Sequence, residues 1–226
     1  MNNQRSWILA TMAALVLTAC GGDGDSSPAP VSVATAQRHL LVDGGAWTLT
    51  GSGADGAPYT MNMTFMPLAA GTTIVSGAAF PRSQQTFAIV QGGVTVSSGG
   101  PTYSFDAASL AIVQSDNGDG TCSLATANTA PPASASVGAG ASLYALSDLD
   151  GCTGAASTVG TTITTWSLEN DKNVVLLCAN STSKDLSGST TATLSICVQA
   201  APDGSIGTKA RVTIAALGVS TTARNF

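Results

Sequence analysis

A period-two alternation of apolar and polar residues recurs along this chain and constrains its fold more than any other feature. In one segment, Met61, Met63 and Phe65 alternate with threonine and asparagine. The same alternation occurs in segments 47–50, 94–97 and 209–214. Successive side chains of a strand point to opposite faces of a sheet, so each segment has one face for a core and one for solvent. The segments are too short and too rich in threonine and valine for amphipathic helices, so the pattern predicts β-strands.

Turn signals between these segments set the expected number of strands. Glycine follows aspartate, asparagine or another glycine at Asp55-Gly56, Gly92-Gly93, Asn117-Gly118 and Asp203-Gly204. Such dipeptides favour tight turns. Their spacing predicts an all-β fold of about 10–13 antiparallel strands, arranged as a sandwich or a barrel. The best candidate for a helix is short and covers residues 34–42.

One long connection bears on the number of domains. Residues 127–140 contain Pro131-Pro132 and almost only small side chains, which indicates a loop or a connection between domains. The connection divides the β region, residues 34–226, into halves that each open on a Trp-x-Leu strand, at Trp47 and at Trp166. The sequence leaves open whether the region is one β domain or two similar halves divided near 127–140.

The N-terminus has the features of an export signal. Arg5 lies in a short polar start, and an apolar run of about 13 residues follows it and ends at Ala19. A helix that spans a membrane needs roughly 20 residues. We therefore expect residues 1–19 to be a signal peptide that is removed.

The end of this signal predicts a lipid anchor. The motif Leu17-Thr18-Ala19-Cys20 resembles the lipobox of bacterial lipoproteins, which implies cleavage before Cys20 and acylation of that cysteine. Gly21 stands where an aspartate commonly retains such proteins at the inner membrane, so the resemblance implies the outer membrane, with the domain periplasmic or surface-facing. Residues 20–33 are rich in Gly, Ser and Pro, and we expect them to be the lipidated N-terminus and a flexible tether.

Four cysteines remain when Cys20 is set aside, an even number that suits disulfide formation outside the cytoplasm. We predict a Cys178–Cys197 bridge, because a turn between them would place the two residues opposite each other on neighbouring strands. Cys122–Cys152 is then the second bridge and closes the Pro-rich connection onto the second half. The alternation of its strand places Cys197 on the polar face, which argues against a buried bridge.

Composition excludes several classes of function. Charged residues are 9% of the chain and its net charge is −5, so we expect no surface that binds nucleic acid. His39 is the only histidine and Glu169 the only glutamate, which leaves few groups for acid–base or metal catalysis. We therefore expect no enzymatic activity and no cofactor.

One loop is similar to the start of a calcium-binding EF-hand loop. Asp116, Asn117 and Asp119 are of the residue types that bind calcium, but Ser115 and Thr126 stand where such a loop has Asp and Glu. Most aspartates of the chain stand in or beside Gly-containing turns, and turn chemistry accounts for them. We therefore expect no metal site, with calcium at these three residues as the alternative.

The first predicted strand bears on function. Gly45-Ala46-Trp47 resembles the Gly-x-Trp opening of lipocalins, whose barrels hold an apolar ligand. The resemblance implies a late arginine packed on Trp47, for which Arg211 and Arg224 are the candidates. From the sequence we favour a lipid-anchored, non-enzymatic structural or interaction module of the cell envelope, with a protein or glycan partner. A lipocalin-like carrier of a small apolar ligand is the alternative.

Overall fold

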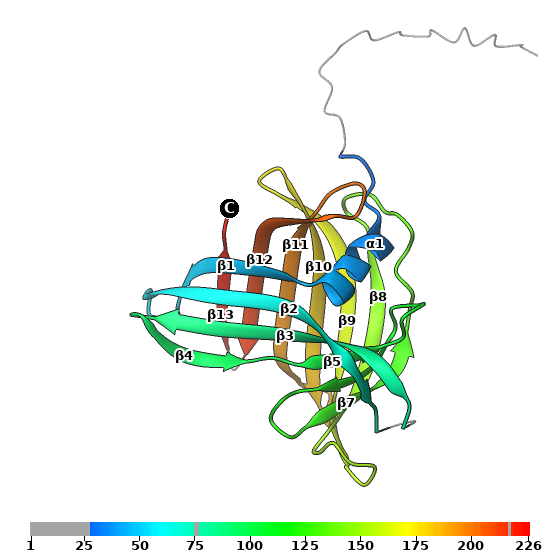
Figure 1. The fold of residues 1–226 in the computed structure, drawn as a ribbon. Coiled ribbons are helices and arrows are strands. Elements are labelled where there is room, and N and C mark those ends of the chain that lie inside the picture. The colour runs from blue at the N-terminus through cyan, green and yellow to red at the C-terminus, as the bar shows by residue number, and fades with distance from the viewer. Residues whose placement is uncertain (1–27, 75–76, 217) are drawn as a thin grey trace, which may run out of the picture.

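Residues 28–74, 77–216 and 218–226 are described by the structure, a computed structural model. They form one antiparallel sheet of 13 strands, of which 12 close into a barrel (Figure 1). The all-β class and the number of strands predicted from the sequence are confirmed. The predicted signal peptide, Cys20 and residues 21–27 of the tether lie outside the described residues.

Two short helical segments precede the strands: α1 (Val33–Arg38) and the π-helix η1 (His39–Asp43). They occupy the segment in which the sequence predicts a helix. The strands are β1 (Gly45–Ser52), β2 (Pro58–Thr72), β3 (Ala79–Gln91), β4 (Val94–Gly99), β5 (Thr102–Phe105), β6 (Ile112–Asp116), β7 (Cys122–Asn128), β8 (Gly140–Leu149), β9 (Thr158–Asp171), β10 (Val174–Asp185), β11 (Thr190–Ala200), β12 (Ile206–Ala216) and β13 (Val219–Arg224).

The barrel closes because strands from the two ends of the sequence pair with each other. β1 pairs with β2 on one side and with the C-terminal β13 on the other. β2 then pairs with β3, β3 with β5, and each later strand with the next one along the chain, as far as β13. The strands that flank the Pro-rich connection, β7 and β8, pair with each other in this same sheet.

β4 is the strand outside the closed barrel. It pairs with the second half of β3, and β5 pairs with the first half. The chain crosses from β4 to β5 at Gly100, whose φ is +148° and whose Cβ, if it had one, would lie 2.1 Å from the carbonyl oxygen of Gln85. This crossing therefore requires glycine.

The main core lies on the inner faces of β1, β2 and their neighbours. Trp47, Leu49, Met61, Met63 and Val212 are all buried in one cluster. They are apolar residues of segments 47–50, 61–65 and 209–214, so the period-two pattern identified the inward side chains of these strands. In segment 94–97 the prediction of a core face is wrong, because Val94 and Val96 of β4, outside the closed barrel, are 65% and 56% exposed.

α1 and η1 cover one end of the barrel (Figure 1), which we call the closed end. Val33 and Ala36 of α1 and Leu41 of η1 are buried among side chains of the barrel. Val31 pairs with Ala135 of the 129–139 connection, and the Ser32 N–H donates a hydrogen bond to the carbonyl of Pro202. Two loops thus hold the N-terminal segment in place. Within the described ranges, none of the helices has the length and apolar character needed to cross a membrane.

Candidate functional site

The barrel interior contains a cavity beneath the helical cover, which we call the inner chamber. Its volume is about 90 Å³. Its lining is mainly apolar and includes Leu41, Phe65, Trp166, Leu177, Ile196 and Val198. These residues come from η1 and from several strands, so the chamber is enclosed by the barrel wall and its cover.

A larger cavity, the outer chamber, adjoins the inner one and has a volume of about 400 Å³. Its polar lining includes Ser115, Asn117, Asp148, Thr162, Ser181 and Ser183. Tyr103, Tyr144, Ser181 and Leu194 line both chambers. β8 begins beside the closed end and carries Asp148 near its other end, so the outer chamber extends toward the opposite end of the barrel.

The change from apolar to polar lining follows two neighbouring strands. On the inward face of β9, Leu168 and Trp166 are followed toward the outer chamber by Thr164 and Thr162. On β10 the inward residues are Leu177, Ala179, Ser181 and Ser183. The register pairs Leu168 with Leu177, Trp166 with Ala179, Thr164 with Ser181 and Thr162 with Ser183. Side chains of the same character therefore lie side by side, and the polarity changes at one level of the wall.

Hydrogen bonds hold the polar part of this wall. The hydroxyls of Thr164 and Ser181 are 2.8 Å apart, and those of Thr162 and Ser183 are 2.9 Å apart. Thr162 also lies 2.9 Å from a carboxylate oxygen of Asp148, to which it donates. The polar residues of the wall are thus linked to one another by hydrogen bonds.

Two tyrosines stand where the chambers meet. Burial raises the pKa of Tyr103 well above its ordinary value, and its interactions with Tyr144 raise it further. Burial also raises the pKa of Tyr144, although hydrogen bonds from Thr164 and Tyr103 partly offset this effect. Both side chains are therefore neutral phenols at physiological pH and can donate or accept hydrogen bonds.

Gln85 places a polar group in the inner chamber. Its side chain lines that cavity and is only 2% exposed. Its Nε2 atom is buried and has no hydrogen-bond partner among the residues that the structure describes. A buried donor without a partner costs about 1–3 kcal/mol, so the chamber contains one group that a ligand with an acceptor would satisfy.

The two chambers have few charged groups in their lining. Among the described residues that line the two chambers, Asp148 is the only one with a charged side chain. The interior therefore combines an apolar region, a region rich in hydroxyl groups and a single carboxylate.

The structure contains both predicted disulfides. Cys178 and Cys197 are opposite each other on β10 and β11 and form one bridge, and Cys122 and Cys152 form the other. Cys197 lies on the outer face of its strand, as its alternation predicts. The expectation that this bridge is unburied is nevertheless wrong, because both of its cysteines are 0% exposed.

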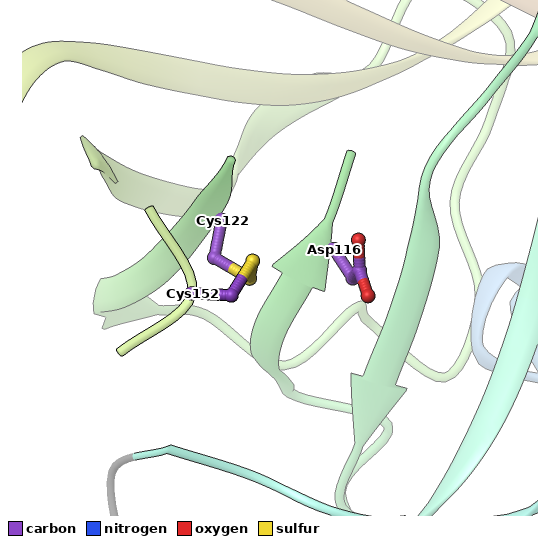
Figure 2. A group of neighbouring side chains, drawn as sticks. All are labelled: Asp116, Cys122 and Cys152. Carbon is purple, nitrogen blue, oxygen red and sulfur yellow. A yellow bond between two sulfur atoms is a disulfide. The ribbon is translucent and has the colours of Figure 1, made fainter. Parts of the chain in front are cut away.

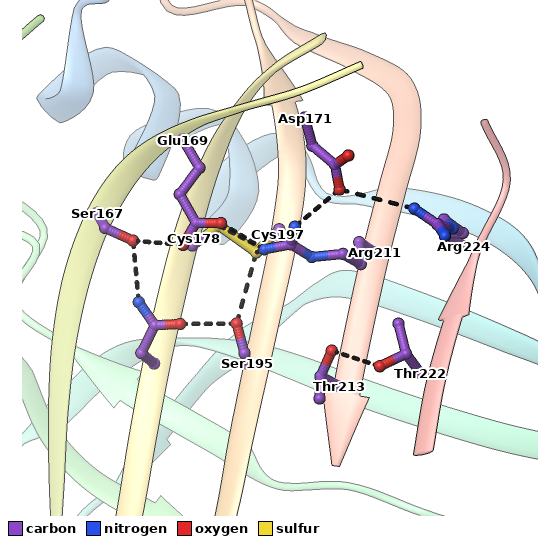
Figure 3. The surroundings of a disulfide bond; sticks show 11 residues. Ser167, Glu169, Asp171, Cys178, Ser195, Cys197, Arg211, Thr213, Thr222 and Arg224 are labelled. Carbon is purple, nitrogen blue, oxygen red and sulfur yellow. Dashed lines mark hydrogen bonds and ion pairs between the residues drawn. A yellow bond between two sulfur atoms is a disulfide. The ribbon is translucent and has the colours of Figure 1, made fainter. Parts of the chain in front are cut away.

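The bridge on the outer face is buried because Arg211 and Glu169 lie over it (Figure 3) and because the apolar side chains of Val174, Leu176 and Phe226 pack against it. Arg211 lies 3.3 Å from the sulfur of Cys197 and forms ion pairs with Glu169 at 2.5 Å and with Asp171 at 2.8 Å. Arg224 lies 3.8 Å from Asp171. This network belongs to the outside of the barrel.

The same placement corrects the arginine that the lipocalin resemblance implies. Trp47 points into the barrel, where its indole N–H donates a hydrogen bond to the carbonyl of Gly207 and its ring meets Phe65 edge to face. Arg211 and Arg224 alternate with the inward residues Val212 and Ala223 and therefore lie on the outer face. Neither arginine packs on Trp47.

The calcium candidates take part in turn hydrogen bonds. Asp116 accepts one from the N–H of Gly118, Asp119 accepts two from Thr121, and Asn117 donates one to the Thr121 hydroxyl. Asp116 lies beside the Cys122–Cys152 bridge (Figure 2). The sulfurs of this group are in a disulfide, which leaves Asp116 as its one anionic oxygen donor. Binding of calcium at these residues stays an alternative that the geometry does not favour.

Sequence reasoning did not identify the groups that line the chambers. Gln85, Tyr103 and Tyr144 lie in segments without a motif. One signal was present, since Thr162 and Thr164 share the alternation phase of Trp166 and Leu168 and must face the same way. The chain matches no known family, no curated protein and no solved structure.

Proposed function

We propose that this protein is a non-enzymatic, ligand-binding lipoprotein of the cell envelope that holds a small molecule inside its barrel. The observation that carries the proposal is the pair of adjoining chambers. As the number of strands in a barrel rises, its interior becomes too wide for side chains to fill, and larger barrels enclose ligand cavities. The outer chamber, at about 400 Å³, lies within the size range of small-molecule sites.

The position of the N-terminus supports an orientation for this site. The described chain starts at Pro28, eight residues after Cys20, and reaches the closed end at once. Eight residues can reach at most about 28 Å even when fully extended. With Cys20 acylated, the closed end faces the lipid and the outer chamber opens away from it.

Native mass spectrometry tests the proposal. A Cys20→Ala protein, exported without lipid, should be purified from cells with a discrete bound mass that organic extraction removes. Ser181→Phe places a ring where the two chambers meet and should abolish the bound mass. Thr182→Phe, the neighbouring residue on the outer face of β10, is the control and should retain it. A parent protein without bound mass contradicts the proposal, as does a bound mass that persists in Ser181→Phe.

A second candidate is the interaction module favoured from the sequence, and β4 supports it. In the described sheet β4 has one edge without a partner strand, and Val94 and Val96 on it are 65% and 56% exposed. Such an edge can pair with an extended segment of another protein. A photo-crosslinking residue at position 96 should give a discrete adduct in cells. The same residue at Val159, which is 46% exposed on the barrel wall, should give none.

A further inference from the structure

We infer that the ligand is an uncharged amphiphile, bound with its apolar end toward α1 and its polar head in the outer chamber. This inference rests on the proposed function and specifies the ligand class. It follows from three features of the interior: the order of the two chambers, the position of Gln85 and the charge of the lining.

The order of the chambers sets the direction of the ligand. The inner chamber is covered by α1 and η1 and is walled by Trp166, Leu177 and Ile196. The hydroxyls of Thr164 and Ser181 begin where this apolar wall ends, and those of Thr162 and Ser183 follow. The alkyl chain of a ligand is therefore best removed from water in the inner chamber, at the closed end. A head group with several hydroxyls can form hydrogen bonds with the polar side chains of the outer chamber.

Gln85 distinguishes an amphiphile from a plain hydrocarbon. Its unpartnered Nε2 is a donor in the inner chamber, so a ligand with an ester, ether or hydroxyl oxygen near the start of its chain satisfies it. A hydrocarbon would leave this donor unpaired. The buried amide is thus costly to the empty protein and useful to the complex.

The charge of the lining argues against an acidic head. Asp148 is in the outer chamber, and among the described lining residues there is no lysine, arginine or histidine to offset it. A carboxylate or phosphate head would have to enter beside a like charge without a counter-ion. Asp148 already accepts a hydrogen bond from Thr162 within a wall of hydroxyls, which suits a neutral, hydroxylated head better than a cation.

Three probes with the same eight-carbon chain test the inference: octyl glucoside, octanoate and octylammonium. Each is titrated calorimetrically, below its micelle concentration, into the Cys20→Ala protein after organic extraction. We expect octyl glucoside to bind and octanoate to bind about tenfold more weakly or not at all. Octylammonium should also be weaker than the glucoside. Tighter binding of either charged probe overturns the inference and leaves the proposed function intact.

Gln85→Leu gives a second readout that a purely structural glutamine would not show. Affinity for octyl glucoside should fall about fivefold, because one hydrogen bond is lost. The melting temperature of the empty protein should rise, because an unsatisfied buried donor is removed. Gln84→Leu, on the outer face of the same strand, should change neither. A fall in melting temperature with unchanged affinity overturns the role of Gln85. If no probe binds and native mass spectrometry finds no bound mass, the proposed function itself fails.

Discussion

Removal of the Cys178–Cys197 disulfide should lower the stability of the barrel by an amount that follows from the length of the loop it closes. The two cysteines are 19 residues apart. For a loop of this size the chain-entropy model gives about 11 cal/mol/K, or about 3.3 kcal/mol at 25 °C. The bridge is fully buried between β10 and β11, so Cys178→Ala/Cys197→Ala also removes sulfur contacts with Arg211. We therefore expect a loss of about 3–4 kcal/mol.

Urea unfolding measures this loss. Trp47 and Trp166 are 5% and 6% exposed, so their fluorescence reports the exposure of the interior. In a domain of this size the loss corresponds to a fall of roughly 7–14 °C in melting temperature. The matched control removes Cys122 and Cys152, which are 30 residues apart and for which the same model gives about 3.7 kcal/mol.

The comparison of the two variants can refute the reasoning. If loop entropy dominates, the two losses agree within about 1 kcal/mol, although one bridge is buried in the sheet and the other involves a half-buried cysteine of a loop. A loss below about 1 kcal/mol for the Cys178–Cys197 variant, with its fold retained, would show that the denatured chain gains little freedom when the bridge is absent.

Three further outcomes follow from the structure. In an absorbance titration, the phenolates of Tyr103 and Tyr144 should appear at higher pH than that of free tyrosine, because both pKa values are raised in the folded protein. The stability linked to these raised pKa values is complete below the unfolded pKa and is lost as pH rises through the folded values. Alkaline unfolding curves for the Tyr103→Phe and Tyr144→Phe variants should therefore show a smaller loss of stability than the parent protein. Leu49→Ala should lower the free energy of unfolding in urea by about 2–5 kcal/mol, because Leu49 is 0% exposed. Thr48→Ala, at an exposed position of the same strand, should change it by no more than about 0.5 kcal/mol. Equal losses for the two variants would contradict the assignment of Leu49 to the inner face. Hydrogen bonds from the turn, of which the one from the Ser187 hydroxyl has the largest effect, lower the pKa of Asp185. The stability that ionised Asp185 contributes is therefore present above the ordinary aspartate pKa and is lost as pH falls through the lowered pKa. An Asp185→Asn variant that remains less stable than the parent protein at the lowest pH would contradict this prediction.

The sequence alone determined the local features of this protein. Alternation identified strands and, in β1, β2 and β12, their inward residues, because side-chain direction in a strand depends only on position. Glycine-containing turns separated the strands, and the short loop between Cys178 and Cys197 placed these residues opposite each other. Each of these features depends on residues that are near one another in the chain.

Only the tertiary structure decided how the sheet closes and what it encloses. The pairing of β1 with β13 joins residues about 170 positions apart, and no local pattern specifies it. Closure is what turns Thr162, Ser181 and Gln85 from sheet side chains into the lining of two chambers. It also sets Arg211 over a buried disulfide and away from Trp47. These contacts are long-range, and the polarity of a side chain does not by itself tell whether the space it faces is solvent, another side chain or a cavity.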